Sequence, residues 1–110
     1  MREYTPHRWV VVKFTKPDGD TFHKVLAGWY GGYLDSASWQ LNSGIRSVTV
    51  LDSGDYVFHG HSGSKYFCKP GCEGLTSLTA SVLDSFEKEA EAAHVKLEIV
   101  NAAEYVEAFC

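Results

Sequence analysis

The chain has 110 residues, the length of one small domain, and its hydrophobic content of 45% is enough for one compact core. The net charge of -4 argues against a general DNA- or RNA-binding protein, which normally carries a basic surface. A small phosphorylated ligand held by a few local cations stays open. The longest apolar run is too short to cross a bilayer, and the first residues lack the apolar core of a signal peptide, so we expect a cytoplasmic protein without membrane contact.

Alternating apolar residues predict a β-hairpin near the start of the chain. Residues 8–16 form its first strand, because Val10, Val12 and Phe14 then share one face. A turn at residues 16–20 uses Gly19 for a positive φ, and residues 21–30 form the returning strand. Large side chains alternate on both faces near the end of that strand, so we expect it to be covered on both sides.

The middle of the chain contains turn signals that separate short strands. Residues 33–45 lack clean periodicity and are interpreted as a loop or a short irregular strand. Residues 46–51 are rich in β-branched side chains and predict a strand, followed by a turn at residues 52–55. Residues 56–61 and 64–68 are expected to pair through a turn at Ser62 and Gly63.

The apolar period changes from two to about 3.6 after Gly74. Leu75, Leu78, Val82 and Phe86 form a stripe that predicts an amphipathic helix from about residue 75 to residue 94. A last strand is expected at residues 96–100. The sequence thus predicts an α+β fold in one domain, residues 1–110. We expect an antiparallel β-meander sheet of five to six strands packed against one long helix in the C-terminal half.

A short terminal helix is expected after the last strand. Asn101 is a suitable N-cap, and Glu104 lies three residues on, as in a capping box. Val106 and Phe109 are then expected to dock this helix on the rest of the domain.

The first candidate site is a phosphate site at the start of the long helix. Gly71, Gly74, Thr76 and Ser77 surround a helix N-terminus, where free backbone amides and the helix dipole favour an anion. Two serines and two lysines would complete it, and they are Ser62, Ser64, Lys65 and Lys69. This site requires the turn at residues 60–64 and the helix start to lie on the same side of the domain. The alternative needs no ligand, since glycines also serve turns and Thr76 can serve as an N-cap.

The second candidate is a stacking site for a nucleobase. Trp29, Tyr30, Tyr33 and Trp39 are close in sequence and interleaved with glycines, so their rings can form a slot for a flat base. Three polar residues follow that can contact the edge of a base or its phosphate, and they are Asn42, Ser43 and Arg46. The alternative is that Trp29 and Trp39 are anchors of the core.

Histidines and cysteines in the second half raise two further hypotheses. His59 and His61 would share one strand face, and together with Cys68 and Cys72 they could form a tetrahedral zinc site. His59, His61, Cys68 and Asp55 could instead act in nucleophilic catalysis. The cysteine spacing is not diagnostic and no catalytic motif is present, so we favour neither a metal nor an enzyme, and we expect no cofactor. Three cysteines cannot all pair, so we expect free thiols.

The residues expected to bind a ligand combine the first two candidates with the two histidines. They are Trp29, Tyr30, Trp39, Asn42, Ser43, Arg46, His59, His61, Ser62, Ser64, Lys65, Lys69, Thr76 and Ser77.

Three segments of the sequence resemble a family of small proteins encoded by tailed bacteriophages. The segments are KVLAGWYGGYL, SWQLNSGI and YVFHGHSGSKYFCKPGCEG, and the resemblance extends from about Trp9 to Phe86. It implies a phage origin and a location in the host cytoplasm, and it implies no particular activity.

A small phage-encoded domain without an enzyme motif suggests a role in counter-defence, for which two mechanisms compete. The first is a sponge that sequesters a nucleotide-derived immune signal of the host, which requires a concave, cationic and aromatic pocket. The second is an inhibitor that covers a host defence protein, as an anti-CRISPR does, which requires an exposed and often acidic surface. The local lysines, glycine turns and tryptophans favour the first mechanism, and the net charge of -4, concentrated on residues 84–91 of the long helix, fits the second. Self-association is compatible with either.

Overall fold

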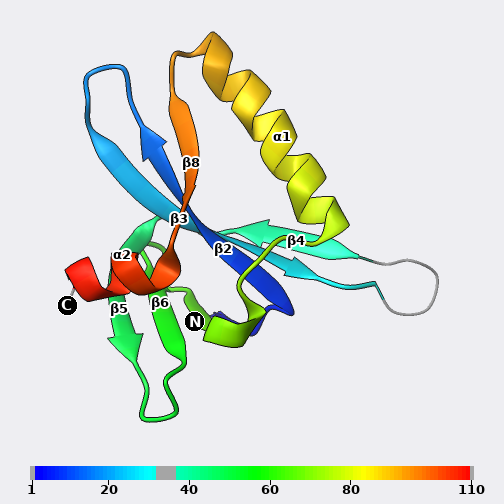
Figure 1. The fold of residues 1–110 in the computed structure, drawn as a ribbon, viewed down its shortest axis with the longest axis vertical. Coiled ribbons are helices and arrows are strands. Elements are labelled where there is room, and N and C mark those ends of the chain that lie inside the picture. The colour runs from blue at the N-terminus through cyan, green and yellow to red at the C-terminus, as the bar shows by residue number, and fades with distance from the viewer. Residues whose placement is uncertain (1, 32–36, 110) are drawn as a thin grey trace.

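The computed structural model describes residues 2–31 and 37–109, and in this part of the chain it is an α+β domain with two sheets and two α-helices (Figure 1). The strands are β1 (Glu3–Tyr4), β2 (Arg8–Thr15), β3 (Thr21–Trp29), β4 (Ser38–Leu41), β5 (Ile45–Val50), β6 (Tyr56–Gly60), β7 (Lys65–Cys68) and β8 (Lys96–Val100). The helices are α1 (Ser77–Ala92), α2 (Ala102–Phe109) and a 3-10 turn, η1 (Pro70–Cys72).

The eight strands form two sheets of four, so the predicted single meander of five to six strands is wrong. The central sheet has the order β4-β3-β2-β8, and the outer sheet has the order β1-β7-β6-β5. The chain leaves the central sheet after β4 and enters the outer sheet at Ile45, passing Gly44 with a φ of 126°. Alternating apolar side chains predict where strands lie but not which strands pair. The change from one sheet to the other could therefore not be predicted from the sequence pattern.

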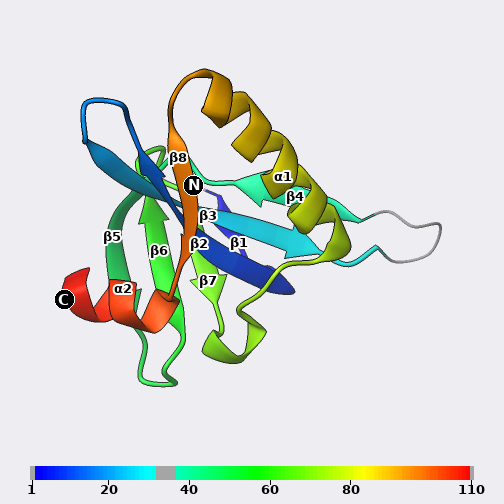
Figure 2. The same cartoon turned by 45° about the horizontal axis from the view of Figure 1, so that its top comes forward.

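The central sheet is the middle layer of the domain, and its strands β2 and β3 are buried on both faces. Trp9 and Val11 of β2 pack with Phe58 and Tyr66 against the outer sheet. Residues 10 and 12 of the same strand face the other way, toward Leu83 of helix α1. Figure 2 shows α1 on one side of the central sheet, with strands β5, β6 and β7 on the other. The expectation that β3 is covered on both sides is confirmed, since residues 25 and 27 face the outer sheet and residue 26 faces α1.

Helix α1 has 16 residues and is shorter at both ends than the stripe predicted. Thr76 is its N-cap, because the Thr76 side chain accepts from the Thr79 amide at 3.1 Å and the Thr79 hydroxyl accepts from the Thr76 amide at 2.8 Å. These threonines pack on Gly28, where a Cβ would lie 2.7 Å from Thr79 Cγ2. At the other end His94 takes a φ of 59°, which stops the helix.

Helix α2 begins as predicted and docks differently. Asn101 accepts from the Glu104 amide at 3.0 Å, so the predicted N-cap is confirmed. Val106 is buried, whereas Phe109 is 46% exposed, so the expected docking of Phe109 is wrong. Tyr105 docks instead, with its ring 4.5 Å from the His23 ring of β3. Tyr105 and Val106 therefore both pack against the core between the two sheets.

The three predicted tight turns are present. Gly19, Gly54 and Gly63 have φ values of 91°, 89° and 90°, each in the turn of a hairpin. Strand β1, in contrast, was not predicted. It has two residues and pairs with β7 in parallel, so it is too short to show a period.

The helices of the described part of the chain do not combine the length and apolar composition needed to cross a bilayer.

Candidate ligand-binding site

Three serines join the chain crossing after β4 to the turn between β6 and β7. Ser43 Oγ accepts from the Ser62 amide at 2.9 Å and donates to Ser62 Oγ at 3.1 Å, and Ser62 Oγ lies 3.1 Å from Ser64 Oγ. We call Ser43, Ser62 and Ser64 the serine cluster. Gly60 makes the close approach possible, because a Cβ there would lie 3.1 Å from Ser43 Oγ. Two turns about 20 residues apart in sequence are thereby fixed as one surface.

An inner pocket of about 530 Å³ opens beside the serine cluster, between the two sheets. Its lining comes from β1, β3, β4, β7 and the two serine-containing turns, and comprises Arg2, Tyr4, Lys24, Gln40, Leu41, Asn42, Ser43, Ser62, Ser64 and Tyr66. Two of these residues are cations and none is acidic. Neither Arg2 nor Lys24 forms an ion pair within the described residues. The pocket therefore favours a negatively charged ligand.

Asn42 is one of the residues that line the inner pocket and is 2% exposed. Its Oδ1 accepts from the Val25 amide at 2.7 Å, which fixes which end of the amide is oxygen and which is nitrogen. The other end, Nδ2, is buried and has no hydrogen-bond partner in the part of the chain that the structure describes. Nδ2 lies 3.5 Å from the position of a Cβ on Gly60. A buried amide donor without an acceptor costs about 1–3 kcal/mol, so a ligand that supplied the acceptor would recover that free energy.

An outer pocket of about 420 Å³ lies on the other side of Ser64, on the outer sheet. Arg46, His59 and Lys65 line it, together with Ser47 and the glycines of the β6–β7 turn. His59 is held by a hydrogen bond of 2.9 Å between its Nε2 and Thr49 Oγ1. This lining is also cationic and lacks acidic residues.

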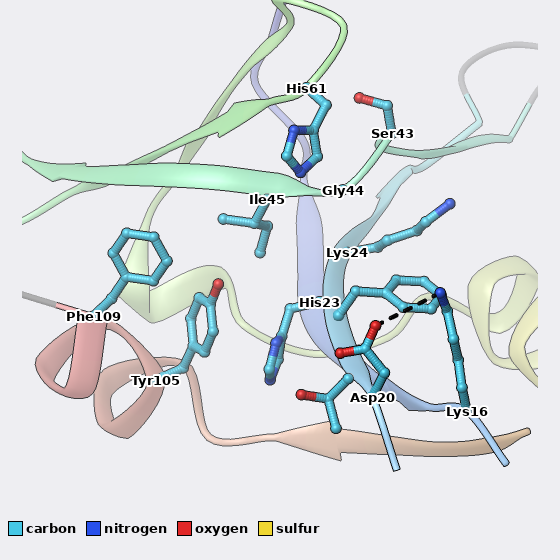
Figure 3. A pocket seen from close by; sticks show the side chains of 12 residues that line it. Lys16, Asp20, His23, Lys24, Ser43, Gly44, Ile45, His61, Tyr105 and Phe109 are labelled. Atoms are coloured by element: carbon cyan, nitrogen blue, oxygen red, sulfur yellow. Dashed lines mark ion pairs between the residues drawn. The ribbon is translucent and has the colours of Figure 1, made fainter. Parts of the chain in front are cut away.

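An edge pocket of about 630 Å³ lies where β4 ends and leaves the edge of β3 open (Figure 3). Lys24 and Ser43 line both the edge pocket and the inner pocket, so the two are neighbours. His61 extends over Gly44 into the edge pocket, and Tyr105 and His23 lie side by side at its opposite end. Burial and the nearby Lys13 charge lower the pKa of His23. Asp20 is an acidic residue in this lining, and it is paired with Lys16 at 3.8 Å.

The structure brings together the predicted residues from the middle of the chain. Eight line the three pockets: the serine cluster itself and five residues around it, which are Asn42, Arg46, His59, His61 and Lys65. His59 and His61 do not share a strand face as expected, because β6 ends at Gly60 and His61 lies in the turn. They line different pockets.

The predicted aromatic slot is not assembled from Trp29 and Trp39. The Trp39 ring lies 5.6 Å from Phe86 of helix α1, edge to face, while Trp29 Nε1 donates to the Thr5 carbonyl at 3.1 Å. Tyr30 stacks on His7 at 5.7 Å. Each ring therefore has a separate partner. Tyr33 lies outside the described residues.

The helix start is separated from the serine cluster, so the expectation that both lie on the same side is wrong. Thr76 and Ser77 lie at α1, which packs on one face of the central sheet, and the serine cluster belongs to the outer sheet on the other face (Figure 2). Thr76 uses its hydroxyl and its amide in the capping box. Lys69 lies near η1, where its carbonyl accepts from Trp9 Nε1 at 2.8 Å, and it lines a separate pocket with Tyr30 and Cys72.

The residues of the zinc and catalytic hypotheses lie in different environments. Cys68 is fully buried beside Trp9 in the core between the sheets, whereas His59 lies at the outer pocket. Burial raises the pKa of the Cys68 thiol, which disfavours the thiolate needed of a ligand or nucleophile. Cys68 and Cys72 are free thiols, and Cys110 is outside the described residues. Three His, Cys, Asp or Glu side chains do not cluster as metal ligands anywhere in the described part.

Sequence reasoning missed the two cations of the inner pocket. Lys24 occurs in an alternating strand, where a lysine normally marks the solvent face, and Arg2 lies in the segment before the first predicted strand. Both line the pocket only in the folded chain. Arg2 is brought there by strand β7, because the Arg2 carbonyl accepts from the Lys65 amide at 2.9 Å. No local pattern contains that contact.

In comparisons with known proteins, the chain matches no family model, no curated protein and no solved structure.

Proposed function

We propose that this protein is a phage-encoded counter-defence protein that binds and sequesters a nucleotide-derived immune signal in the host cytoplasm. The observation that carries the proposal is the inner pocket, which gathers Arg2, Lys24 and the serine hydroxyls without any acidic residue in its lining. The chain as a whole has a net charge of -4, so a pocket whose charged residues are all cations is a local exception, and its positive charge attracts an anionic ligand. The resemblance to phage proteins supports the phage origin, and the sequence, which lacks a catalytic motif, supports binding rather than turnover.

The nucleotide class follows from the pair of neighbouring pockets. The inner pocket supplies positive charge, while the edge pocket supplies rings at His61, Tyr105 and His23. A nucleotide combines an anionic group with a flat base, and bases stack on aromatic side chains for about 1–3 kcal/mol each. Lys24 lies at the boundary and can contact both parts of such a ligand.

A thermal-shift screen against linear and cyclic nucleotides tests the proposal. A ligand at 100 times its dissociation constant stabilises the fold by about 2.7 kcal/mol, which raises the Tm of a domain of this size by several degrees. Lys24→Gln should remove this increase. Lys88→Gln is the matched control, because Lys88 is 77% exposed on helix α1 and lies outside the three pockets. Failure of every nucleotide to raise the Tm of the unmodified protein would contradict the proposal.

A second candidate function is inhibition of a host defence protein by direct contact, and the surface of helix α1 favours it. Asp84, Glu87, Glu89 and Glu91 are all exposed on this helix. Only Asp84 forms an ion pair within the described residues, with Lys88 at 3.2 Å. Such a surface can bind a basic patch of a partner, as a mimic of nucleic acid does.

Charge reversal separates the two functions. The double variant Glu87→Lys and Glu91→Lys would abolish protection of the phage if contact through α1 were responsible. Sequestration at the inner pocket predicts that the same variant protects as well as the original protein.

A further inference from the structure

We propose that the inner pocket is a phosphoryl subsite in which Asn42 Nδ2 donates to one oxygen of the group and Lys24 and Arg2 neutralise its charge. This inference rests on the proposed function for its biological role, because it names the part of the nucleotide that the pocket takes. The site itself is argued from the geometry of Asn42.

The unpartnered Asn42 amide is the observation that points to a ligand. The side chain is 2% exposed and cannot turn freely, because its Oδ1 accepts from Val25 at 2.7 Å. Nδ2 is thereby held toward the serine cluster with its donor capacity unused by any described residue. Buried polar groups are normally paired, so this donor on a residue that lines the pocket leaves a place for an acceptor from outside the chain.

A glycine lies next to this donor and permits close packing around it. A Cβ on Gly60 would lie 3.5 Å from Asn42 Nδ2 and 3.1 Å from Ser43 Oγ. Gly60 does not have a positive φ, so its backbone conformation alone does not require glycine. The absence of a side chain there lets the Asn42 amide and the Ser43 hydroxyl both lie close to the same backbone position, beside the inner pocket that both residues line.

The donors around this space suit a phosphoryl group better than a carboxylate. They come from several directions, with Arg2 just before β1, Lys24 on β3, Asn42 after β4 and the serines on two turns. A phosphoryl group presents up to three acceptor oxygens in a tetrahedral arrangement, whereas a carboxylate presents two in one plane. The Tyr66 phenol also lines the pocket, and burial raises its pKa, so it stays neutral and remains a donor.

Titration with inorganic phosphate tests this subsite without any nucleotide. The full chain is labelled with ¹⁵N, and sodium phosphate is added at constant pH and constant ionic strength while the side-chain NH₂ signals of Asn42 are followed. We expect these signals and the backbone amide signals of Ser43 and Ser62 to move together and to saturate. Sodium acetate at the same ionic strength should move them at least tenfold less at equal concentration.

Two aspartate variants provide the matched comparison. Asn42→Asp keeps an acceptor for the Val25 amide and replaces the donor with a negative oxygen, so it should weaken phosphate binding at least tenfold. Asn101→Asp adds the same charge at the exposed N-cap of α2 and preserves the cap, so it should bind phosphate as the original chain does. If Asn42→Asp does not fold, Gly60→Ala serves instead, because it fills the space beside Nδ2 without adding charge.

The outcomes separate this inference from the proposed function. Phosphate that leaves the Asn42 signals unmoved, or binds a folded Asn42→Asp or Gly60→Ala chain at full strength, overturns the phosphoryl subsite. A nucleotide that binds while the Asn42 signals stay in place also overturns the subsite and leaves sequestration standing. Phosphate that moves the Asn42 signals when no nucleotide binds supports the subsite and contradicts nucleotide sequestration.

Discussion

His61 Cδ2 lies 2.9 Å from the position that a Cβ would take on Gly44, so a glycine at the crossing between the sheets sets the position of a ring in the edge pocket. Gly44 also has a φ of 126°, which L side chains rarely adopt. We therefore expect Gly44→Ala to cost about 1–2 kcal/mol of folding free energy from the backbone alone. His61 is exposed, so its ring should rotate away rather than resist.

Gly54→Ala is the control for this prediction. Gly54 also has a positive φ, but no atom lies within 4 Å of its Cβ position. Urea unfolding should give similar losses of stability for the two variants, while only Gly44→Ala should shift the imidazole NMR signals of His61. Unchanged His61 signals in Gly44→Ala would show that the glycine does not position this ring.

Thr76→Ala tests whether the start of helix α1 has a role beyond folding. The substitution removes the hydroxyl that accepts from the Thr79 amide and keeps the bond from the residue 76 amide to the Thr79 hydroxyl, so we expect a loss of about 0.5–2 kcal/mol in the free energy of unfolding. Binding of inorganic phosphate should not change, because the helix start and the serine cluster lie on opposite faces of the central sheet. Thr76→Ser should retain most of the stability. Weaker phosphate binding by a folded Thr76→Ala chain would restore the helix start as the anion site.

The pKa of His23 predicts a loss of stability in acid. Burial and the Lys13 charge lower this pKa below 6.5 in the folded protein. His23 therefore binds a proton more readily in the unfolded chain than in the folded one. Its contribution to stability is present above pH 6.5 and is lost as the pH falls through the pKa of the folded state. Urea unfolding at neutral and acidic pH should show a smaller loss for Lys13→Gln. Lys88→Gln, which removes an exposed charge on helix α1, should behave as the original chain, and equal losses in all three would contradict this assignment.

The two described cysteines should differ in reactivity. Burial first and the neighbouring Cys72 second raise the pKa of the Cys68 thiol, so its thiolate is scarce in the folded protein. Iodoacetamide at neutral pH should modify Cys72 and leave Cys68 unmodified until the protein is unfolded in urea. Mass spectrometry of the digested protein measures both sites. Early modification of Cys68 would mean that the core between the sheets opens readily.

The same shift adds an alkaline limit to stability. A thiol whose pKa is raised on folding stabilises the protein fully below its unfolded pKa, here 9.0, and this contribution is lost as the pH rises beyond it.

The sequence predicts most elements of this fold because hairpins and caps are local. The turns at Gly19, Gly54 and Gly63 and the caps at Thr76 and Asn101 depend on residues only a few positions apart. The separation into two sheets depends on which strands pair across the domain, and that information is not local. The prediction of one meander was wrong for this reason.

The candidate site divides in the same way. Residues close to Ser62 in sequence were predicted, and Ser43 was predicted as part of the aromatic candidate. Arg2 and Lys24 were missed, because only the tertiary arrangement brings them to the inner pocket. Trp39 was predicted as a stacking surface, and the structure packs it against Phe86 of a helix that begins about 40 residues later.

Equilibrium dialysis against a defined mixture of linear and cyclic nucleotides tests sequestration most directly. Mass spectrometry then measures the concentration of each nucleotide on the two sides of the membrane. We predict that at least one nucleotide is enriched on the side that contains the protein, and that Lys24→Gln loses this enrichment while Lys88→Gln keeps it. Equal concentrations of every nucleotide on both sides, or enrichment unaffected by Lys24→Gln, would contradict nucleotide binding at the inner pocket.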